Sequence, residues 1–343
     1  MFDEERGPFL NVTSEIGRLK AVLLHKPGKE LERLTPDYLR DLLFDDIPWL
    51  RKMRDEHDEF ADVLRQRGTE VYYIEDLLTE ILTNLDVKRN LINDILINSN
   101  IENHELRELI FSYIFEKTPA EAAEIAIAGL NKKDIQDVDR EYSLSDYIRK
   151  DYPLYINPIP NLYFMRDPLS IIGNGISINS MQTNARRREP MLIKYIYDYN
   201  LLFRKEYSQI WYNYTIPHSI EGGDILVLSK EVVAVGCSER TSANGIEILA
   251  RNLFAGNNDI KEVLAVQIPP LRAFMHLDTV FTMVDRDKFT VYPGILDRVD
   301  VYRLTPGGRN GIKVTPENDL VGALKKSLKL PAVSLIQSGG GDT

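Results

Sequence analysis

The second half of the sequence alternates short apolar runs with segments of helical spacing, and this alternation restricts the chain to an α/β fold. Residues 224–228 and 231–235 are rich in Ile, Leu and Val, and Ser229-Lys230 between them predicts a β-hairpin. Similar patterns predict helices at 246–253 and 320–328 and strands at 263–268 and 333–336. They also predict a strand pair at 280–284 and 289–292. Strands that alternate with helices predict repeated α/β units.

The first half begins in the same way and then changes character. Strand-like residues 21–25 and 71–74 flank a helical pattern at 53–64, which predicts another α/β unit. Residues 69–118 contain neither Gly nor Pro and carry helical spacing. We therefore expect three segments: 1–75 as the first part of the α/β structure, 76–150 as an inserted helical subdomain and 151–343 as the remainder.

Composition excludes several classes of function. The net charge of -10 argues against a general phosphate-backbone binder, which needs a basic face. A single cysteine excludes an intramolecular disulfide and suits a reducing cytoplasm. The sequence has neither a signal-peptide pattern at its start nor an apolar run that could span a bilayer. We expect a soluble cytoplasmic protein that binds neither nucleic acid nor membrane.

Four carboxylates next to Gly, Pro or strand starts are candidates for a site: Asp167, Glu221, Asp224 and Asp278. Carboxylates that accept paired N–H bonds are the best ligands for a planar cation such as guanidinium. Taken singly, each carboxylate is more simply a turn or cap residue. The histidine His276 changes this balance, because on a strand it would face the same side as Asp278 and could act as a general acid and base.

The remaining reactive side chains have simpler interpretations. We expect the other four histidines to be core residues: His25, His57, His104 and His218. Arg186-Arg187-Arg188 is typical of a solvated face or of the first turn of a helix, whereas Arg240, between a strand and a helix, could pair with a substrate carboxylate. Cys237 is most simply a small buried apolar residue. No Cys/His cluster has metal-ligand spacing, so the sequence predicts no metal site.

Four motifs in this order resemble arginine deiminases. They are Asn161-Leu162-Tyr163-Phe164-Met165-Arg166-Asp167-Pro168, Glu221-Gly222-Gly223-Asp224, Ser238-Glu239-Arg240-Thr241-Ser242 and His276-Leu277-Asp278-Thr279-Val280-Phe281. The resemblance extends from residue 23 to residue 343, and the helical insertion falls where that family has its own. Related guanidine-modifying enzymes, such as agmatine deiminases and amidinotransferases, lack the insertion.

The resemblance implies a five-unit α/β propeller that hydrolyses L-arginine to L-citrulline and ammonia without a metal or an organic cofactor. Asp167 and Asp278 would clamp the guanidinium group, and Glu221 would assist them and orient His276. Residues at the amino-acid end of the substrate would be Asn161, Phe164, Arg186 and Arg240, with Asp224 also in the binding site. His276 would protonate the departing ammonia and then activate the water that resolves a covalent thiouronium intermediate. A homo-oligomer is expected, as in many enzymes of this kind.

The nucleophile is the part of this family pattern that the sequence does not supply. The family's catalytic cysteine would follow residue 343, whereas Cys237 precedes His276. In addition, Ser338-Gly339-Gly340-Gly341-Asp342 repeats the pattern of residues 219–224, but no strand follows it. We therefore expect an incomplete last propeller unit and an inactive, truncated form of the enzyme. The alternative is a relative that binds arginine or a partner surface without catalysis.

Overall fold

The computed structural model of the protein describes residues 10–135, 142, 144–148, 151–204 and 208–339. The chain divides into two compact units, which we treat separately. Unit 1 comprises Met1–Arg18, Arg166–Pro190 and Lys205–Thr343, and unit 2 comprises Leu19–Met165 and Met191–Arg204. Within the described residues no helix combines the length and the apolar character that crossing a membrane requires.

Unit 1 repeats one strand arrangement three times in its described residues. An antiparallel pair is followed along the chain by a third strand that lies parallel to the second member of the pair. The three sets are β5 (Leu169–Ile172), β6 (Gly175–Ile178) and β7 (Gln209–Tyr212); β8 (Ile225–Ser229), β9 (Val232–Cys237) and β10 (Glu262–Gln267); and β11 (Phe281–Met283), β12 (Lys288–Val291) and β15 (Ser334–Gln337). The parallel strand requires a crossover connection, which explains the helices between the strands.

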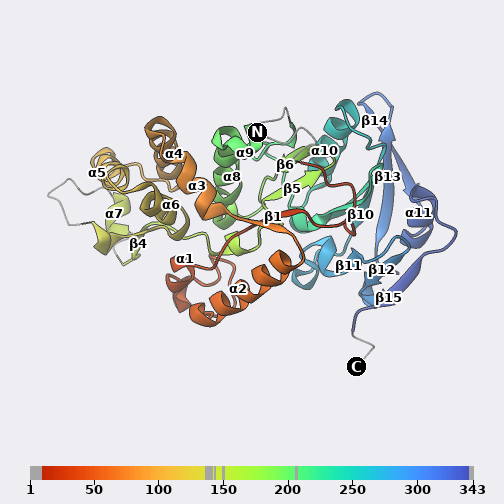
Figure 1. Ribbon diagram of the computed structural model, residues 1–343, viewed down its shortest axis with the longest axis horizontal. Helices are drawn as coiled ribbons and strands as arrows, with labels where there is room; N and C mark the ends of the chain where they lie inside the picture. Colours follow the sequence, from red (N-terminus) through yellow and green to blue (C-terminus); the bar gives the residue numbers. More distant parts are fainter. Residues whose placement is uncertain (1–9, 136–141, 143, 149–150, 205–207, 340–343) are drawn as a thin grey trace. The chain divides into compact units, whose positions relative to one another are not determined.

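The second set is extended by a further hairpin. β13 (Asp300–Pro306) pairs antiparallel with β10, and β14 (Ile312–Glu317) pairs antiparallel with β13, which gives the sheet order β14-β13-β10-β9-β8 (Figure 1). α10 (Ala243–Ala255) joins β9 to β10, and α11 (Leu320–Ser327) precedes β15. The predicted hairpin at 224–235, the strand pair at 280–292 and both of these helices are confirmed.

Both faces of this sheet are buried, because successive side chains of a strand point to opposite faces. Val227, Val233 and Val263 belong to a core that includes the apolar side of α10. Leu226, Ala234, Leu264 and their neighbours belong to a second core with residues of β11, β12 and α11. Burial on both faces accounts for the nearly continuous Val and Leu runs of these strands.

Unit 2 begins with a parallel pair and continues with helices. β1 (Ala21–Leu24) pairs with β2 (Glu70–Tyr73), and α2 (Leu50–Gln66) lies between them in sequence. Four helices follow: α3 (Ile74–Ile81), α4 (Leu85–Asn98), α5 (His104–Phe115) and α6 (Pro119–Ala128). They contact one another. α4, α5 and α6 lie within the range expected for the helical insertion, whereas α3 begins two residues before it. The limits at 76 and 150 remain predictions. β3 (Leu130–Asn131) and β4 (Leu154–Ile156) pair antiparallel. The unit also contains three short helices, α1 (Lys29–Glu32), α7 (Leu144–Ile148) and α9 (Leu201–Arg204). Part of α8 (Arg188–Tyr199) belongs to it as well.

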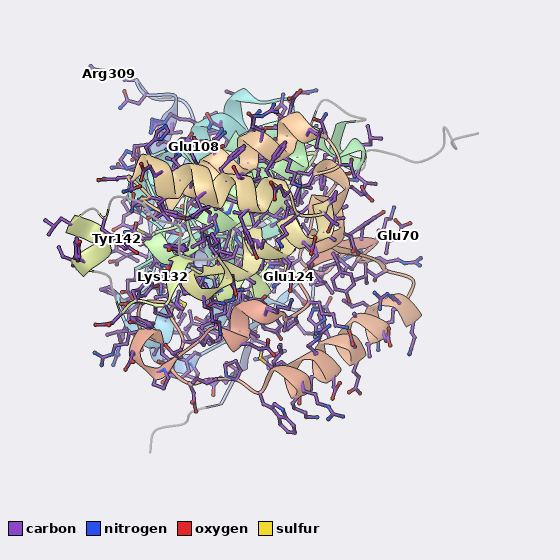
Figure 2. The ribbon with its side chains drawn as sticks, turned by 90° about the vertical axis from the view of Figure 1, so that its left-hand side faces the viewer. Glu70, Glu108, Glu124, Lys132, Tyr142 and Arg309 are labelled. Carbon is purple, nitrogen blue, oxygen red and sulfur yellow. The ribbon has the colours of Figure 1, made fainter. Side chains whose placement is uncertain are left out.

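The helices of unit 2 show why this range lacks Gly and Pro until residue 119. Each of α4, α5 and α6 begins at a side chain that caps it, and Thr118 forms a complete capping box with Glu121 ahead of Pro119. On α5, Ile110 is buried whereas Glu108 is exposed to solvent (Figure 2). The helical pattern at 53–64 predicts one apolar face that includes His57 and Phe60. This face is only partly correct, because His57 is buried but Phe60 is 53% exposed.

His25, directly after β1, lies buried between two carboxylates. Its Nε2 is 3.1 Å from Glu30 and its Nδ1 is 3.0 Å from Glu75. Burial lowers the pKa of the ring, but the two carboxylates outweigh it and raise the pKa to about 9. The expectation of a core histidine is thus confirmed for His25 and for the buried His57. It is wrong for His104, which is exposed at the start of α5.

The raised pKa of His25 predicts a pH-dependent stability. Its contribution is fully present below pH 6.5, declines as the pH rises towards about 9 and is absent above that value. Between these limits we expect the free energy of unfolding of the wild type to fall, relative to His25→Gln, by on the order of a few kcal/mol. Urea denaturation over this pH range measures the difference. The exposed His104→Gln serves as control, and an unchanged slope in His25→Gln would contradict the assignment.

Candidate active site

The predicted carboxylates of unit 1 and His276 occupy the same place in each of the three strand sets. Asp167 lies two residues before β5, Glu221-Gly222-Gly223-Asp224 ends directly before β8, and His276-Leu277-Asp278 lies shortly before β11. A turn that enters the first strand of each set therefore carries every one of these side chains. Such turns on a rigid sheet framework are a common place for binding residues.

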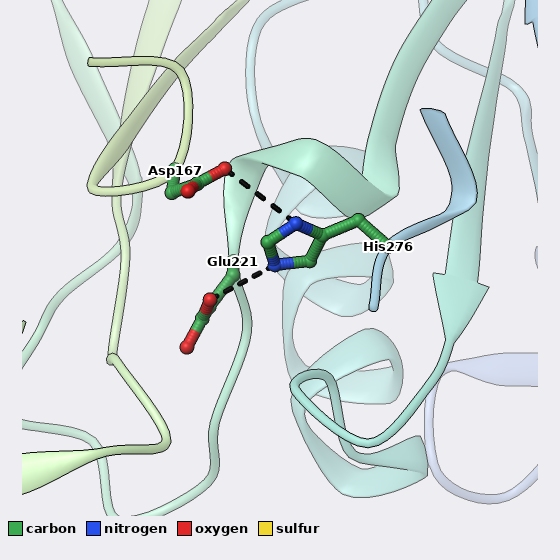
Figure 3. A group of neighbouring side chains, drawn as sticks. All are labelled: Asp167, Glu221 and His276. Atoms are coloured by element: carbon green, nitrogen blue, oxygen red, sulfur yellow. Dashed lines mark hydrogen bonds and ion pairs between the residues drawn. The ribbon is translucent and has the colours of Figure 1, made fainter. Parts of the chain in front are cut away.

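His276 lies between two carboxylates from the other turns (Figure 3). Its Nε2 is 2.9 Å from Oε2 of Glu221, and its Nδ1 is 3.7 Å from Oδ1 of Asp167. All three side chains are buried. Burial lowers the pKa of His276, but the hydrogen bond to Glu221 and the nearby negative charges together raise it above its ordinary value. The ring is therefore favoured in its protonated form, as a general acid requires.

Close backbone packing holds the turns together. The carbonyl oxygen of Asp167 accepts hydrogen bonds from the Gly222 amide at 2.8 Å and from the Asn179 side chain at 2.8 Å. A Cβ atom on Gly223 would lie 2.6 Å from the His276 ring, and one on Gly222 would collide with the carbonyl of Arg166. The pair Gly222-Gly223 is thus required for the approach of the first and third turns to the second.

Asp224 joins the second turn to the third. Its Oδ1 accepts from the backbone amide of Leu277 at 2.8 Å, and its Oδ2 accepts from the Ser238 hydroxyl at 2.7 Å. Burial raises the pKa of Asp224 to about 7, against the opposing effect of His276 and these hydrogen bonds. Asp224 therefore fixes the segment that carries His276, and its expected contact with substrate remains a prediction.

Arg186 forms a buried ion-pair network with Asp167 and Glu189. Nη1 is 2.5 Å from Oδ2 of Asp167, while Nε and Nη2 donate to Glu189 at 2.8–3.1 Å. The expected solvated face is wrong for Arg186 and Arg188, which are both buried, whereas Arg187 is exposed. The alternative of a first helical turn is correct for Arg188, where α8 begins.

Asp278 reaches the site through a different geometry from the one expected. Residues 277–279 form a short 3-10 turn rather than a strand, so His276 and Asp278 are not side by side on a pleated face. Asp278 instead pairs with Arg166, whose Nε lies 3.2 Å from its Oδ2. Burial raises the pKa of Asp278, while Arg166 and His276 lower it. His276 therefore lowers the pKa of Asp278 through its charge, although the two residues do not lie on a common strand.

The other predicted residues are placed as follows. Asn161 and Phe164 belong to unit 2, where Asn161 donates to the Leu42 carbonyl at 2.7 Å and Phe164 is half exposed. Arg240 is buried between β9 and α10. Cys237 ends β9 and is half-buried, and burial together with Asp224 raises the pKa of its thiol. The expected fully buried cysteine is only partly correct, but its surroundings oppose the thiolate.

The group Asp167, Glu221 and His276 also has the composition of a metal site. Their donor atoms lie within 4.8 Å of one another. However, the two carboxylates face opposite nitrogens of one ring, so an ion bound at either nitrogen would leave the other carboxylate on the far side of the imidazole. We interpret the group as a hydrogen-bonded acid–base cluster.

Comparison with known proteins identifies the family. The family model described as arginine deiminase matches residues 40–343. The chain belongs to the arginine deiminase family. It is 46% identical to arginine deiminase of Bacillus cytotoxicus, over 97% of this chain and 82% of that protein, and 46% identical to the enzyme of Clostridium perfringens over the same shares.

Two solved structures of other proteins are similar to the chain at low sequence identity. DDAH from Pseudomonas aeruginosa, in complex with citrulline, matches with a TM-score of 0.45 at 13% identity, over 80% of this chain and 69% of that one. Inosamine-phosphate amidinotransferase from Streptomyces griseus matches with a TM-score of 0.42 at 11% identity, over 98% of this chain and 79% of that one.

Two carboxylates of this candidate site were not expected from the sequence. Glu189 follows Arg186 by three positions, and this spacing is typical of an ion pair between residues on one helix face. The sequence could therefore have predicted this pair. Glu15 contacts Arg166 across 151 positions, and no local pattern predicts such a contact. Neither carboxylate belongs to the motifs on which the family resemblance depends.

The Glu221–His276 contact predicts a measurable change in ionisation. Glu221→Gln removes the charge and weakens the hydrogen bond that favour the imidazolium, so the pKa of His276 should fall. A histidine ring-proton NMR titration measures this, with His276→Gln to assign the resonance. Asp297→Asn, at an exposed aspartate of the same unit, should leave the titration unchanged. An unaltered His276 midpoint in Glu221→Gln would contradict the proposed contact.

Proposed function

We propose that the site of this chain serves the hydrolysis of L-arginine to L-citrulline and ammonia. The observation that carries the proposal is the buried imidazole held between Asp167 and Glu221. It combines an acid–base group with carboxylates suited to a guanidinium cation. The relatives that carry the name arginine deiminase support the same reaction.

In the proposed reaction Asp167 and Asp278 bind the guanidinium group, and Glu221 orients His276. The reaction that the family resemblance implies uses a cysteine thiolate other than that of Cys237. This thiolate attacks the guanidinium carbon, a C–S bond forms, and the C–N bond breaks as His276 donates a proton to the departing ammonia. His276 then takes a proton from water, the water oxygen bonds to the carbon, and the C–S bond breaks to release citrulline and restore the thiolate.

The amino-acid end of arginine is assigned to Asn161, Phe164, Arg186 and Arg240, and Asp224 is a further proposed substrate-binding residue. Arg186 already binds Asp167 and Glu189, so a substrate carboxylate would share a guanidinium group that the chain itself engages. The proposal therefore gives Arg186 a second task, which is to hold Asp167 beside His276. We also propose the five-unit propeller with an inserted helical subdomain, which the three strand sets of unit 1 support.

The 343 residues contain one cysteine, and its surroundings do not suit the nucleophile. Burial and the neighbouring Asp224 both favour the neutral thiol of Cys237, whereas attack requires the thiolate. We propose that these residues by themselves bind arginine but do not convert it. The second candidate function is that of a relative of the enzyme whose role is arginine binding alone, and the same combination of a carboxylate clamp and an unsuitable thiol favours it.

Turnover and binding of arginine test these proposals separately. We expect no citrulline from the 343-residue chain incubated with L-arginine, and no difference between the wild type and Cys237→Ala. Citrulline formation that disappears in Cys237→Ala would overturn the assignment of Cys237.

Calorimetry should show L-arginine binding to the 343-residue chain. Asp278→Asn should weaken it by about tenfold or more, because a charged hydrogen-bond partner is lost. Asp297→Asn, an exposed carboxylate of the same unit, is the matched control. Equal affinity of Asp278→Asn and wild type would remove Asp278 from the clamp.

A further inference from the structure

Arg166 adjoins Asp167 in the turn before β5, and the roles proposed above leave its guanidinium group unused. Its side chain is 44% exposed, yet it contacts three separate segments of unit 1. Nη2 donates to the Ile225 carbonyl at 2.8 Å and lies 3.3 Å from Glu15, while Nε lies 3.2 Å from Asp278. Three contacts from one side chain, two of them to carboxylates, form a network that restrains its guanidinium group more than an isolated surface ion pair would.

Glu15 is itself fixed on both sides. Its backbone amide donates to the Val227 carbonyl at 2.9 Å, and its Oε1 accepts from the Val227 amide at 2.8 Å. Its other oxygen, Oε2, faces Arg166. The N-terminal segment is also paired to the β5–β6 hairpin through Val12 and Gly173. Backbone hydrogen bonds therefore fix Glu15, which in turn contacts the Arg166 guanidinium group that pairs with Asp278.

We propose that Arg166 is a positioning residue for arginine binding, and that its guanidinium group, anchored by Glu15 and the Ile225 carbonyl, holds the Asp278 carboxylate ready for the substrate cation. The proposal rests on the function proposed above. Glu15 lies outside residues 40–343, which the family model matches, so this support comes from a segment that the model does not include.

The charges around Asp278 explain why such support is needed. Asp278 is largely buried and is influenced by the negative charges of Asp167 and Glu15 and by the positive charges of Arg166 and His276. Burial and the two carboxylates favour its neutral form, whereas Arg166 and His276 favour its ionised form. A neutral carboxyl group loses the charge-assisted hydrogen bonds that a guanidinium cation makes.

Removal of Arg166 should weaken arginine binding and also change Asp278 in the ligand-free protein. In Arg166→Met we expect L-arginine affinity, measured by calorimetry at about pH 7, to fall by about tenfold. Arg166→Lys keeps the charge without the planar fork and should recover part of the loss. Arg309→Met, at an exposed arginine in the turn between β13 and β14 (Figure 2), is the matched control.

A carboxyl ¹³C NMR titration, with Asp278→Asn for assignment, follows Asp278 without any ligand. We expect the pKa of Asp278 to rise in Arg166→Met and to stay unchanged in Arg309→Met. If Arg166→Met does not fold, Arg166→Gln, which also removes the positive charge, should raise the pKa of Asp278 in the same direction and decides the question. An unchanged titration would overturn the proposal.

The direction of the change in L-arginine affinity distinguishes a positioning role of Arg166 from competition between Arg166 and the substrate for Asp278. If Arg166→Met binds L-arginine more tightly, Arg166 competes with the substrate for Asp278, and the positioning role is wrong. If the wild type does not bind L-arginine, the proposed function fails at that step. The titration of Asp278 then still decides whether Arg166 controls this carboxylate.

Discussion

The buried ion pair of Arg186 with Glu189 and Asp167 is the interaction on which the site depends most. Glu189 is completely buried and Arg186 almost so. A charge in this position is tolerated only when its partner remains, since an unpaired buried ion costs several kcal/mol. The same guanidinium group holds Oδ2 of Asp167, so that Oδ1 faces His276. The acid–base cluster is therefore prearranged by the chain itself before any substrate binds.

Repetition explains how the cluster is assembled from distant parts of the sequence. Three sets of strands share one arrangement, and the turn before the first strand of each set carries Asp167, the 221–224 turn or the 276–278 turn. Direct contacts join them, from Gly222 to the Asp167 carbonyl and from Leu277 to Asp224. Glycine at 222 and 223 permits this approach. The site is thus a property of the repeated fold rather than of one loop.

Much of this could be predicted from the sequence, because the signals were local. Short, nearly continuous apolar runs marked β8 and β9, helical spacing marked α10 and α11, and the turn residues marked the carboxylates. The predictions that were wrong concern features that depend on tertiary contacts. The 3-10 turn at 277–279 replaces a strand because Asp224 binds the Leu277 amide. Likewise, the arginines at 186 and 188 are buried although their sequence is typical of a solvated face, and Glu15 reaches Arg166 from a distant segment.

The free energy of unfolding of Arg186→Met, compared with that of the double variant Arg186→Met/Glu189→Gln, tests the central ion pair most directly. The single variant leaves Glu189 buried without its partner, so we expect it to lose about 3–5 kcal/mol in urea denaturation. The double variant also neutralises Glu189 and should recover at least about 1 kcal/mol of that loss. A loss below about 1 kcal/mol in Arg186→Met, with no recovery in the double variant, would contradict the account.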